Sequence, residues 1–346
     1  MTHFDILIIS TAHDSEDGRL VRHKNCFERN GYTAGIHTIS FSSRFARFIL
    51  GPIRARKHII TQKPRCILIP DPELQLLLLP MIRGQCAVIS DIHEDYDLVK
   101  SDRPWISAWI KPVVGLILKF LDFTRSRLSH TVIAAAPHIN VKTDFIITNK
   151  PNIHDLPNPA LSTSSSEIVY VGDIRESRGV DMMLDLVEEI QEITLHLIGP
   201  IKIPSLRKQI QEKELSERVI IHGRLSYFES WEIASKCIAG LSLLSDTPAF
   251  RHTVPTKVWE YWTVGIPVLA TDIPGQANEI KEVQGGATGD YNFLCASLRQ
   301  WIQEPEIPKN LGSLGRNYIE SQVETQDQIL CSALIETLQN FGNKEI

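Results

Sequence analysis

Residues 252–272 read HTVPTKVWEYWTVGIPVLATD, and they join a short helix to a buried strand. Pro255 suits the first turn of a helix, because the backbone N–H that proline lacks would have no intrahelical partner there. Gly265 is typical of a helix end, and residues 266–270 form an apolar run of the kind found in strands buried on both faces. Such strands belong to parallel sheets covered by helices, so the stretch predicts one helix-to-strand step of a doubly wound α/β fold.

The same alternation continues along the chain in both directions. Apolar runs typical of buried strands lie at residues 4–10, 34–39, 66–70, 86–90, 131–136, 145–148, 167–172, 193–199, 218–223, 238–244 and 266–272. Helical patterns separate them, among them residues 17–29, 72–82 and 105–128, and a long amphipathic pattern covers 318–341. Two series of βαβ units predict two doubly wound, Rossmann-like domains. Ligands of such sheets bind at the carboxyl ends of the strands, so two facing domains would hold a ligand in the cleft between them.

The chain of 346 residues is long enough for two domains of ordinary size. Residues 158–167, NPALSTSSSE, have the Pro and Ser content of a linker. We therefore expect an N-terminal domain over residues 1–160, a C-terminal domain over 161–320 and a terminal helix within 321–346.

Composition and charge narrow the class of protein. Hydrophobic residues make up 43% and charged residues 22%, which is ordinary for a soluble globular protein. The six cysteines are scattered without a CxxC pair, which favours a reducing cytoplasm, and neither a signal peptide nor an apolar run of about 20 residues is visible. Residues 1–160 carry 20 basic and 15 acidic residues, so this half suits an anionic partner such as a membrane surface; uneven solvated faces explain the charge equally well.

The opening stretch also carries charge where ligands of such sheets bind. The N–H groups of Thr256, Lys257 and Val258 would point out of the helix start, and Lys257 adds a positive charge there. Glu260 lies about one turn further on, where its carboxylate can accept hydrogen bonds from the vicinal hydroxyls of a ribose. The alternative is a Lys–Glu pair on a helix, worth only tenths of a kcal/mol. The pattern therefore predicts a site for a nucleotide diphosphate.

Two other strand-to-helix loops carry weaker signals. Gly172, the last residue of the run 167–172, allows the chain to turn sharply out of the strand. Arg175 and Arg178 follow it and precede a helix. This arrangement suits an anion site, and solvated loop arginines are the alternative. After residues 218–222, Gly223 permits close approach of the backbone to a flat ligand such as a base. Ser226 there has the spacing of an N-cap, with Glu229 three residues later.

Several motifs together resemble a known family. They are PTKVWEYWTVGIPVLATD (255–272), VYVGDIRESRGV (169–180), LHLIGP (195–200), RVIIHGRL (218–225), HDSEDGRLVRHKNCFERNGY (13–32), PDPELQLLLLP (70–80) and SDIHEDY (90–96). The chain resembles the retaining glycosyltransferases of family 4, the glycogen-synthase-like enzymes with the GT-B fold. The resemblance implies that the N-terminal domain binds the acceptor, that the C-terminal domain binds a nucleotide sugar, and that the terminal helix packs back on the N-terminal domain.

The resemblance also implies roles for individual residues. Glu260 would hold the ribose, Lys257 would touch the diphosphate, and Arg178 would replace the phosphate-binding lysine of the family. His93 would contact hydroxyls of the transferred sugar, although a loop histidine with ordinary partners is the alternative. The remaining residues expected to bind substrate are Asp17, Gly18, Arg19, Gly172, Arg175, His222, Gly223, His252, Thr253, Pro255, Thr256 and Val258.

Two positions depart from the pattern of the family. Asp173 stands where an arginine usually follows the strand-end glycine, so phosphate binding would fall on Arg175, Arg178 or Lys257. His252 stands where a first glutamate, eight residues before Glu260, normally faces the donor sugar. These replacements indicate a subgroup with different sugar contacts, or a relative without activity.

The implied activity is transfer of a sugar from a nucleotide-diphosphate sugar to a glycan or lipid-linked acceptor, with retention, in cell-surface polysaccharide synthesis. The alternatives are an inactive nucleotide-sugar-binding partner subunit and a sugar-nucleotide epimerase of the same fold. We expect no cofactor and no metal, because the group Asp91, His93, Glu94, Asp95 and Asp97 matches no tight ligand spacing.

The expected location is cytoplasmic, with a possible contact at the inner face of the membrane. Residues 104–121 are apolar and residues 44–58 are basic, so both suit an anionic bilayer, while a core helix with a basic loop is the alternative. Nucleic acid is not expected as a partner, because aromatic stacking residues and a known binding motif are missing from the basic stretch.

Overall fold

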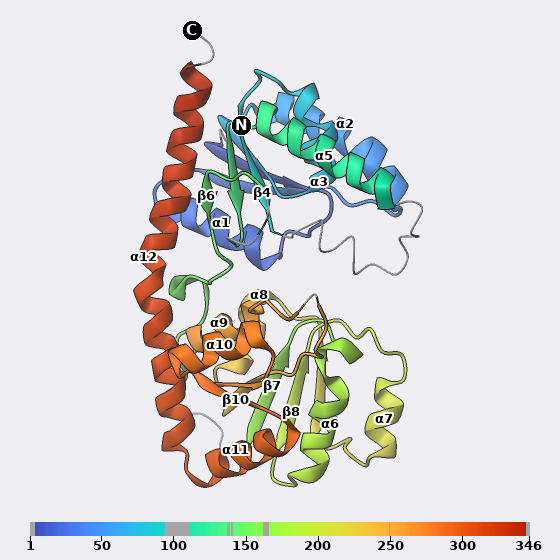
Figure 1. Ribbon diagram of the computed structural model, residues 1–346, viewed down its shortest axis with the longest axis vertical. Helices are drawn as coiled ribbons and strands as arrows, with labels where there is room; N and C mark the ends of the chain where they lie inside the picture. The colour runs from blue at the N-terminus through green and yellow to red at the C-terminus, as the bar shows by residue number, and fades with distance from the viewer. Residues whose placement is uncertain are drawn as a thin grey trace. The chain divides into compact units, whose positions relative to one another are not determined.

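The computed structural model describes residues 4–93, 111–136, 139, 141–161, 166–248 and 250–343 (Figure 1). The chain divides into two compact units, one of Met1–Asn149 with Glu324–Ile346 and the other of Lys150–Val323. The division therefore falls about ten residues before the expected position at 160/161. The reason is local packing, because Leu156 lies in a core of the second unit and Pro159 lies against Gly265.

The first unit contains a six-stranded parallel sheet in the order β2-β1-β3-β4-β5-β6. Its strands are β1 (Ile6–Ser10), β2 (Ala34–Thr38), β3 (Cys66–Ile69), β4 (Ala87–Ile92), β5 (Thr131–Ala134) and β6 (Phe145–Ile146). Every residue of β1, β3, β4 and β5 is buried, as near-continuous apolar runs predict for a sheet covered on both faces.

Helices cover both faces of this sheet. They are α1 (Gly18–Arg29), α2 (Arg44–Gln62), α3 (Pro72–Leu77) with the 3₁₀ turn η1 (Leu79–Met81), and α5 (Lys111–Leu128). Phe27 of α1 packs on the face formed by Ile6 and Ile8, whereas Ile59 of α2 packs on the face formed by Leu7 and Ile9. The basic stretch 44–58, for which a loop was one expectation, is therefore helical.

The second unit also contains a six-stranded parallel sheet, in the order β12-β11-β10-β7-β8-β9. Its strands are β7 (Glu167–Val171), β8 (Thr194–Ile198), β9 (Val219–Gly223), β10 (Ala239–Ser242), β11 (Val268–Thr271) and β12 (Gly286–Gly289). Its helices are α6 (Val180–Glu189), α7 (Leu206–Glu212), α8 (Tyr227–Ala234), α9 (Thr256–Thr263), α10 (Pro274–Val283) and α11 (Tyr291–Gln303), with 3₁₀ turns η2 (Ile153–Asp155) and η3 (Glu176–Arg178). The two parallel sheets confirm the predicted pair of doubly wound domains.

One long helix, α12 (Glu306–Asn343), contributes to both units. Ile319 lies in the core of the second unit, while Leu330 and Leu334 lie in the core of the first. The helix is longer at its start than the amphipathic pattern at 318–341 suggests. No helix in the described part of the chain is long and apolar enough to cross a bilayer.

Candidate functional site

Glycines terminate three neighbouring strands at the carboxyl edge of the sheet in the second unit. Gly172 follows β7, Gly199 follows β8, and Gly223 ends β9. Their backbones stay paired, because the Gly172 amide donates to Ile198 at 2.8 Å and the Gly199 amide donates to Gly223 at 2.7 Å. A Cβ on Gly199 would lie 2.1 Å from the Gly172 carbonyl oxygen, so only glycine fits there. The result is an edge on which a ligand can approach bare backbone.

Lys257 places a buried ammonium group at this edge. The residue lies in the first turn of α9, and its Nζ stands 3.6 Å from the ring centroid of Tyr170, a cation–π contact. The same Nζ lies 3.0 Å from the position that a Cβ on Gly172 would occupy. Burial and then the nearby charge of Arg178 hold the pKa of Lys257 well below its usual value, while Glu260 and Asp173 act in the opposite direction. A bound anion would favour the charged form.

The start of α9 offers backbone amides beside that ammonium group. Pro255 is the N-cap rather than the first helical residue, and no side chain caps the helix. The Val258 amide, which we expected to face a ligand, donates instead to the Pro255 carbonyl at 3.0 Å. The amides of Thr256 and Lys257 and the helix dipole remain the features that favour an anion here.

Glu260 lies one turn beyond Lys257 and is only 6% exposed. Its Oε1 accepts a hydrogen bond of 2.7 Å from the hydroxyl of Tyr227, the first residue of α8. Ser226 and Glu229 form the predicted capping box of that helix. Tyr227 was not among the residues expected from the sequence, where its only signal was its place directly after the predicted N-cap Ser226.

The two arginines predicted to bind phosphate differ in their surroundings. Arg175 forms an ion pair with Asp173, the residue noted above as a departure from the expected pattern. Arg178, in η3, lies over the ring of Phe250 with its Cζ 4.6 Å from the centroid. Gly179 follows with φ +78°, and a Cβ there would lie 1.9 Å from the Leu243 carbonyl oxygen, so glycine lets η3 pack against the end of β10. Arg178 therefore fits the phosphate role better than Arg175.

The loop before α9 contains the other expected residues. His252 is exposed, and the Thr253 hydroxyl donates to the Phe250 carbonyl at 3.2 Å. The backbone of both residues packs closely on Gly275 of α10, where a Cβ would lie 2.6 Å from the Thr253 carbonyl oxygen. His222 is turned to a different partner, since its Nε2 lies 2.9 Å from Nδ1 of His196.

In the first unit, Arg19 is a structural residue. Its Nε and Nη2 donate to the two carboxylate oxygens of Asp91 at 2.8 and 2.6 Å, and its Nη1 donates to the Ile147 carbonyl and to Asn149. Both side chains of the ion pair are buried. Because each guanidinium nitrogen is used inside the unit, the geometry does not support the expected contact of Arg19 with sugar or pyrophosphate. Gly18 is the first residue of α1.

A second polar cluster, defined by His13, Asp17, Asp71 and His93, lies after β1, β3 and β4. His13 Nδ1 is 2.9 Å from an Asp17 oxygen, and its ring meets that of His93 edge to face at 5.1 Å. The hydrogen bond to Asp17 raises the pKa of His13 against the effect of burial. Burial opposes ionisation of Asp17, but the contact with His13 and two backbone amides lower its pKa to about 2.

His13 and Asp71 were not among the site residues expected from the sequence. Asp71 accepts hydrogen bonds from Ser10 and from the hydroxyl and amide of Thr11, so it shapes the loop that carries His13. Both residues lie within stretches quoted above, HDSEDG and PDPEL. Glu94, Asp95 and Asp97, weighed as possible metal ligands, fall outside the described residues.

Comparisons with known proteins agree with the fold. The family model described as Glycosyl transferases group 1 matches residues 155–318. No curated protein sequence matches the chain. Among solved structures, sucrose-phosphate synthase from Thermosynechococcus elongatus is 13% identical with a TM-score of 0.70, and the match covers 93% of this chain and 96% of that one. Anabaena HepE in complex with UDP and glucose is 14% identical with a TM-score of 0.69, covering 96% and 99%. WaaG, a glycosyltransferase of lipopolysaccharide biosynthesis, is 12% identical with a TM-score of 0.64, covering 96% and 99%.

Proposed function

We propose that this chain, a glycosyltransferase of the GT-B fold whose residues 155–318 belong to the glycosyl transferases group 1 family, moves a sugar from a nucleoside-diphosphate sugar to a hydroxyl acceptor with retention of anomeric configuration. The observation that carries the proposal is the buried ammonium of Lys257 beside Gly172, at the uncapped start of α9. Burial lowers the pKa of Lys257 strongly, and ionisable groups perturbed in this way cluster at functional sites.

The diphosphate of the donor fits this position by charge. Lys257, Arg178 and the first amides of α9 would face the phosphate oxygens, on which negative charge grows as the bond to the anomeric carbon breaks. These fixed groups need no reorganisation during the reaction. We therefore propose that transfer does not need a divalent metal ion.

Glu260 supports recognition of the nucleoside. The Tyr227 hydroxyl occupies one carboxylate oxygen and fixes the side chain in place. Such an oriented carboxylate is well suited to accept both hydroxyls of a ribose. HepE is described in complex with UDP and with UDP-glucose, so uridine diphosphate is the first nucleotide to test on this chain.

The cluster of His13, Asp17, Asp71 and His93 is our candidate for sugar or acceptor contacts in the first unit. His13 carries a positive charge when protonated, and Asp17 favours that form. His93 supplies a second imidazole next to it. We propose that His93 binds a hydroxyl of the transferred sugar, and that the acceptor belongs to a cell-surface glycan or to its lipid-linked precursor.

A donor panel tests the activity and the site together. The wild-type chain is expected to hydrolyse or transfer from at least one of the UDP, GDP or ADP sugars, with thermal shifts identifying the base. Glu260→Gln keeps the size of the side chain but removes its charge, so kcat/KM for that donor should fall at least about tenfold, which corresponds to about 1.4 kcal/mol. Glu282→Gln, on α10, is the matched control.

Two outcomes would overturn the assignment. Binding of a nucleotide without any turnover across the panel would favour the inactive partner subunit that His252 and Asp173 suggest. Wild-type kinetics in Glu260→Gln would end the role of Glu260 in the donor site.

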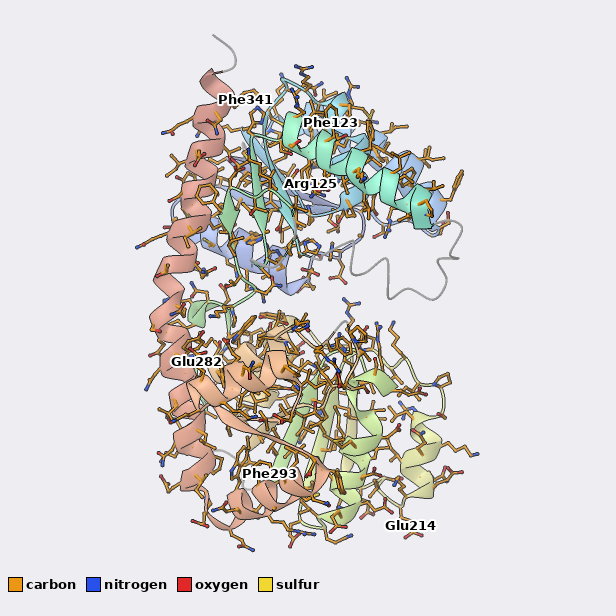
Figure 2. All side chains as sticks on the ribbon, in the orientation of Figure 1. Phe123, Arg125, Glu214, Glu282, Phe293 and Phe341 are labelled. Atoms are coloured by element: carbon orange, nitrogen blue, oxygen red, sulfur yellow. The ribbon has the colours of Figure 1, made fainter. Side chains whose placement is uncertain are left out.

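We further propose that the first unit contacts an anionic membrane through an α2–α5 surface, defined by the exposed side chains of these two helices. Both helices pack on α3, so they lie on one face of the sheet. On α5, Leu121, Thr124 and Arg125 are buried, while a second stripe is open, with Leu116 69% and Phe120 58% exposed. Phe123 and Arg125 of α5 can be followed in Figure 2. The large apolar side chains exposed on the surface are Phe45, Phe48, Ile49, Leu50, Ile53, Ile60, Val113, Leu116, Ile117, Phe120 and Phe123.

Basic charge accompanies these apolar side chains. The sequence of α2, RFARFILGPIRARKHIITQ, contains five arginines and lysines and no acidic residue. Arg54, Lys57, Lys119 and Arg127 are exposed. Exposed apolar groups next to cations are the features that bind a helix to the interface of an anionic bilayer. Residues 104–110, the first part of the apolar segment noted in the sequence, lie outside the described residues.

Co-flotation with vesicles tests this surface. The wild-type chain should float with vesicles of phosphatidylglycerol and phosphatidylcholine, less so at high salt, and poorly with phosphatidylcholine alone. Replacing Leu116 and Phe120 together with serine should weaken binding at least about tenfold, because each buried apolar side chain is worth about 1.5–3 kcal/mol. Phe293→Ser, at an exposed position of the second unit, should leave flotation unchanged. Equal flotation of the double variant would contradict the proposal.

A further inference from the structure

Three side chains of the second unit converge at the end of the sheet opposite the donor-site glycines. Glu167 is the first residue of β7, Cys237 lies just before β10, and His196 is in the middle of β8. One ligand atom from each, a carboxylate oxygen, Sγ and an imidazole nitrogen, lies within 4.8 Å of the others. Gly172 and Gly199 lie at the carboxyl ends of β7 and β8, whereas Glu167 begins β7, so this Glu167–His196–Cys237 cluster is separate from the proposed donor site.

The imidazole of His196 has a free nitrogen directed into the cluster. Its Nδ1 lies 2.9 Å from Nε2 of His222, while its own Nε2 is buried without a hydrogen-bond partner. The side chain is about nine-tenths buried. A buried polar atom without a partner is costly and calls for a ligand or another explanation. If Nδ1–H donates to His222, then Nε2 presents its lone pair toward Glu167, whose oxygen is 3.8 Å away.

The arrangement matches what metal-binding histidines require. Such histidines almost always donate a hydrogen bond from the second ring nitrogen, which fixes the ring and the tautomer. His222 stands where it would accept that hydrogen bond from Nδ1 of His196. Cys237 is fully buried, and its thiol lies 3.5 Å from the Ile233 carbonyl oxygen. The Glu167 side chain is 40% exposed, which leaves a path from solvent to the cluster.

From these contacts we propose that the second unit binds one Zn²⁺ ion through Glu167, His196 and Cys237. One thiolate, one imidazole and one carboxylate form a ligand set that zinc accepts, with water completing a tetrahedron. As the Sγ–Zn bond forms, Cys237 gives its thiol proton to solvent. The ion links the starts of β7 and β10 to β8, so it stabilises the sheet rather than taking part in sugar transfer.

The sequence alone does not indicate this site, because the three ligands are 29 and 41 residues apart and belong to no compact motif. They meet only because β8 and β10 both pair with β7 in the sheet.

Metal titration of the full chain tests the proposal. After dialysis against a chelator, the protein should take up one equivalent of Zn²⁺ in competition with a chromophoric chelator, and its melting temperature should rise. Co²⁺ in place of Zn²⁺ should give a thiolate-to-cobalt charge-transfer band. Cys237→Ala should abolish that band and weaken Zn²⁺ binding at least about tenfold, because losing even an outer-shell partner of a metal ligand typically costs about 10–100-fold.

The control is Cys295→Ala, another buried cysteine of the same unit, which should keep both the band and the affinity. Glu167→Gln, at a partly exposed position, covers the case in which Cys237→Ala does not fold, and it should also weaken binding about tenfold. Absence of stoichiometric Zn²⁺ uptake, or equal affinity in wild type and Glu167→Gln, would overturn the site. It would leave His196 with a simple Nε2–H contact toward Glu167.

Discussion

Replacing Lys257 with methionine is expected to lower kcat/KM for sugar transfer by about 10²–10³-fold, the largest effect on activity that the structure predicts. The Nζ of Lys257 is buried beside Gly172 and over the ring of Tyr170. A fixed positive group aimed at a developing charge is typically worth about 2.7–4 kcal/mol of transition-state stabilisation. Methionine fills a similar volume without the charge. Steady-state kinetics on the donor found in the panel measure the loss.

The same substitution should lower activity without lowering the free energy of unfolding. Because the pKa of Lys257 in the folded chain is lowered, mainly by burial, the unfolded chain binds more protons between the folded and unfolded pKa values. The free energy of unfolding therefore rises with pH through that window, and the charged lysine is least favourable at its acidic end. The methionine variant lacks this slope and should melt no lower than wild type at neutral pH.

The matched control for this prediction is Lys236→Met, a substitution at an exposed lysine of the same unit. It should retain wild-type kinetics and the wild-type pH slope of stability. Wild-type transfer by Lys257→Met would refute the donor site. A lower melting temperature at every pH would show instead that the ammonium stabilises the fold.

The fold could be predicted from the sequence because strands of a buried parallel sheet are encoded as continuous apolar runs. Each of the eleven apolar runs identified in the sequence overlaps a strand of the structure. The strand that was missed, Gly286–Gly289, has the sequence GATG and no large apolar side chain. Its position is set by pairing with β11 and by a backbone so close that a Cβ on Gly286 would lie 2.1 Å from the Val268 carbonyl oxygen. Helix α2 was missed because Pro52 and the basic residues interrupt the apolar pattern of its buried face.

The candidate site was predictable only where its residues share one element. Lys257 and Glu260 are three residues apart on α9, so the sequence shows their relation directly. Tyr170 and Tyr227 contact these two residues from other elements, and no local pattern shows those contacts. Arg19 is a different case, because only the resemblance to the family implied a substrate contact for it. Its partner Asp91, 72 residues away, makes it part of the core.

The buried Arg19–Asp91 ion pair provides the largest expected effect on the free energy of unfolding. Asp91→Asn should destabilise the first unit by about 3–5 kcal/mol, because breaking one side of a buried ion pair leaves the Arg19 charge without compensation. His23, whose Nε2 lies 3.3 Å from an Asp91 oxygen, loses its charged partner as well. Urea unfolding of the full chain, followed by a probe in the first unit, measures the change.

The pH dependence of stability and two further variants distinguish loss of the Arg19–Asp91 ion pair from an unspecific destabilisation of the fold. Burial alone would raise the pKa of Asp91, but the Arg19 guanidinium outweighs it and holds the pKa well below the usual value. The pair therefore contributes stability above the ordinary aspartate pKa and loses it as the pH falls, and Asp91→Asn should flatten this acid dependence.

Arg65→Gln, which breaks the exposed pair with Asp5, should cost at most about 1 kcal/mol. The double variant Arg19→Met with Asp91→Leu should recover part of the loss, since apolar side chains of similar size often replace a buried ion pair without penalty. A loss of less than about 1 kcal/mol in Asp91→Asn would mean that water, rather than Asp91, compensates the charge of Arg19.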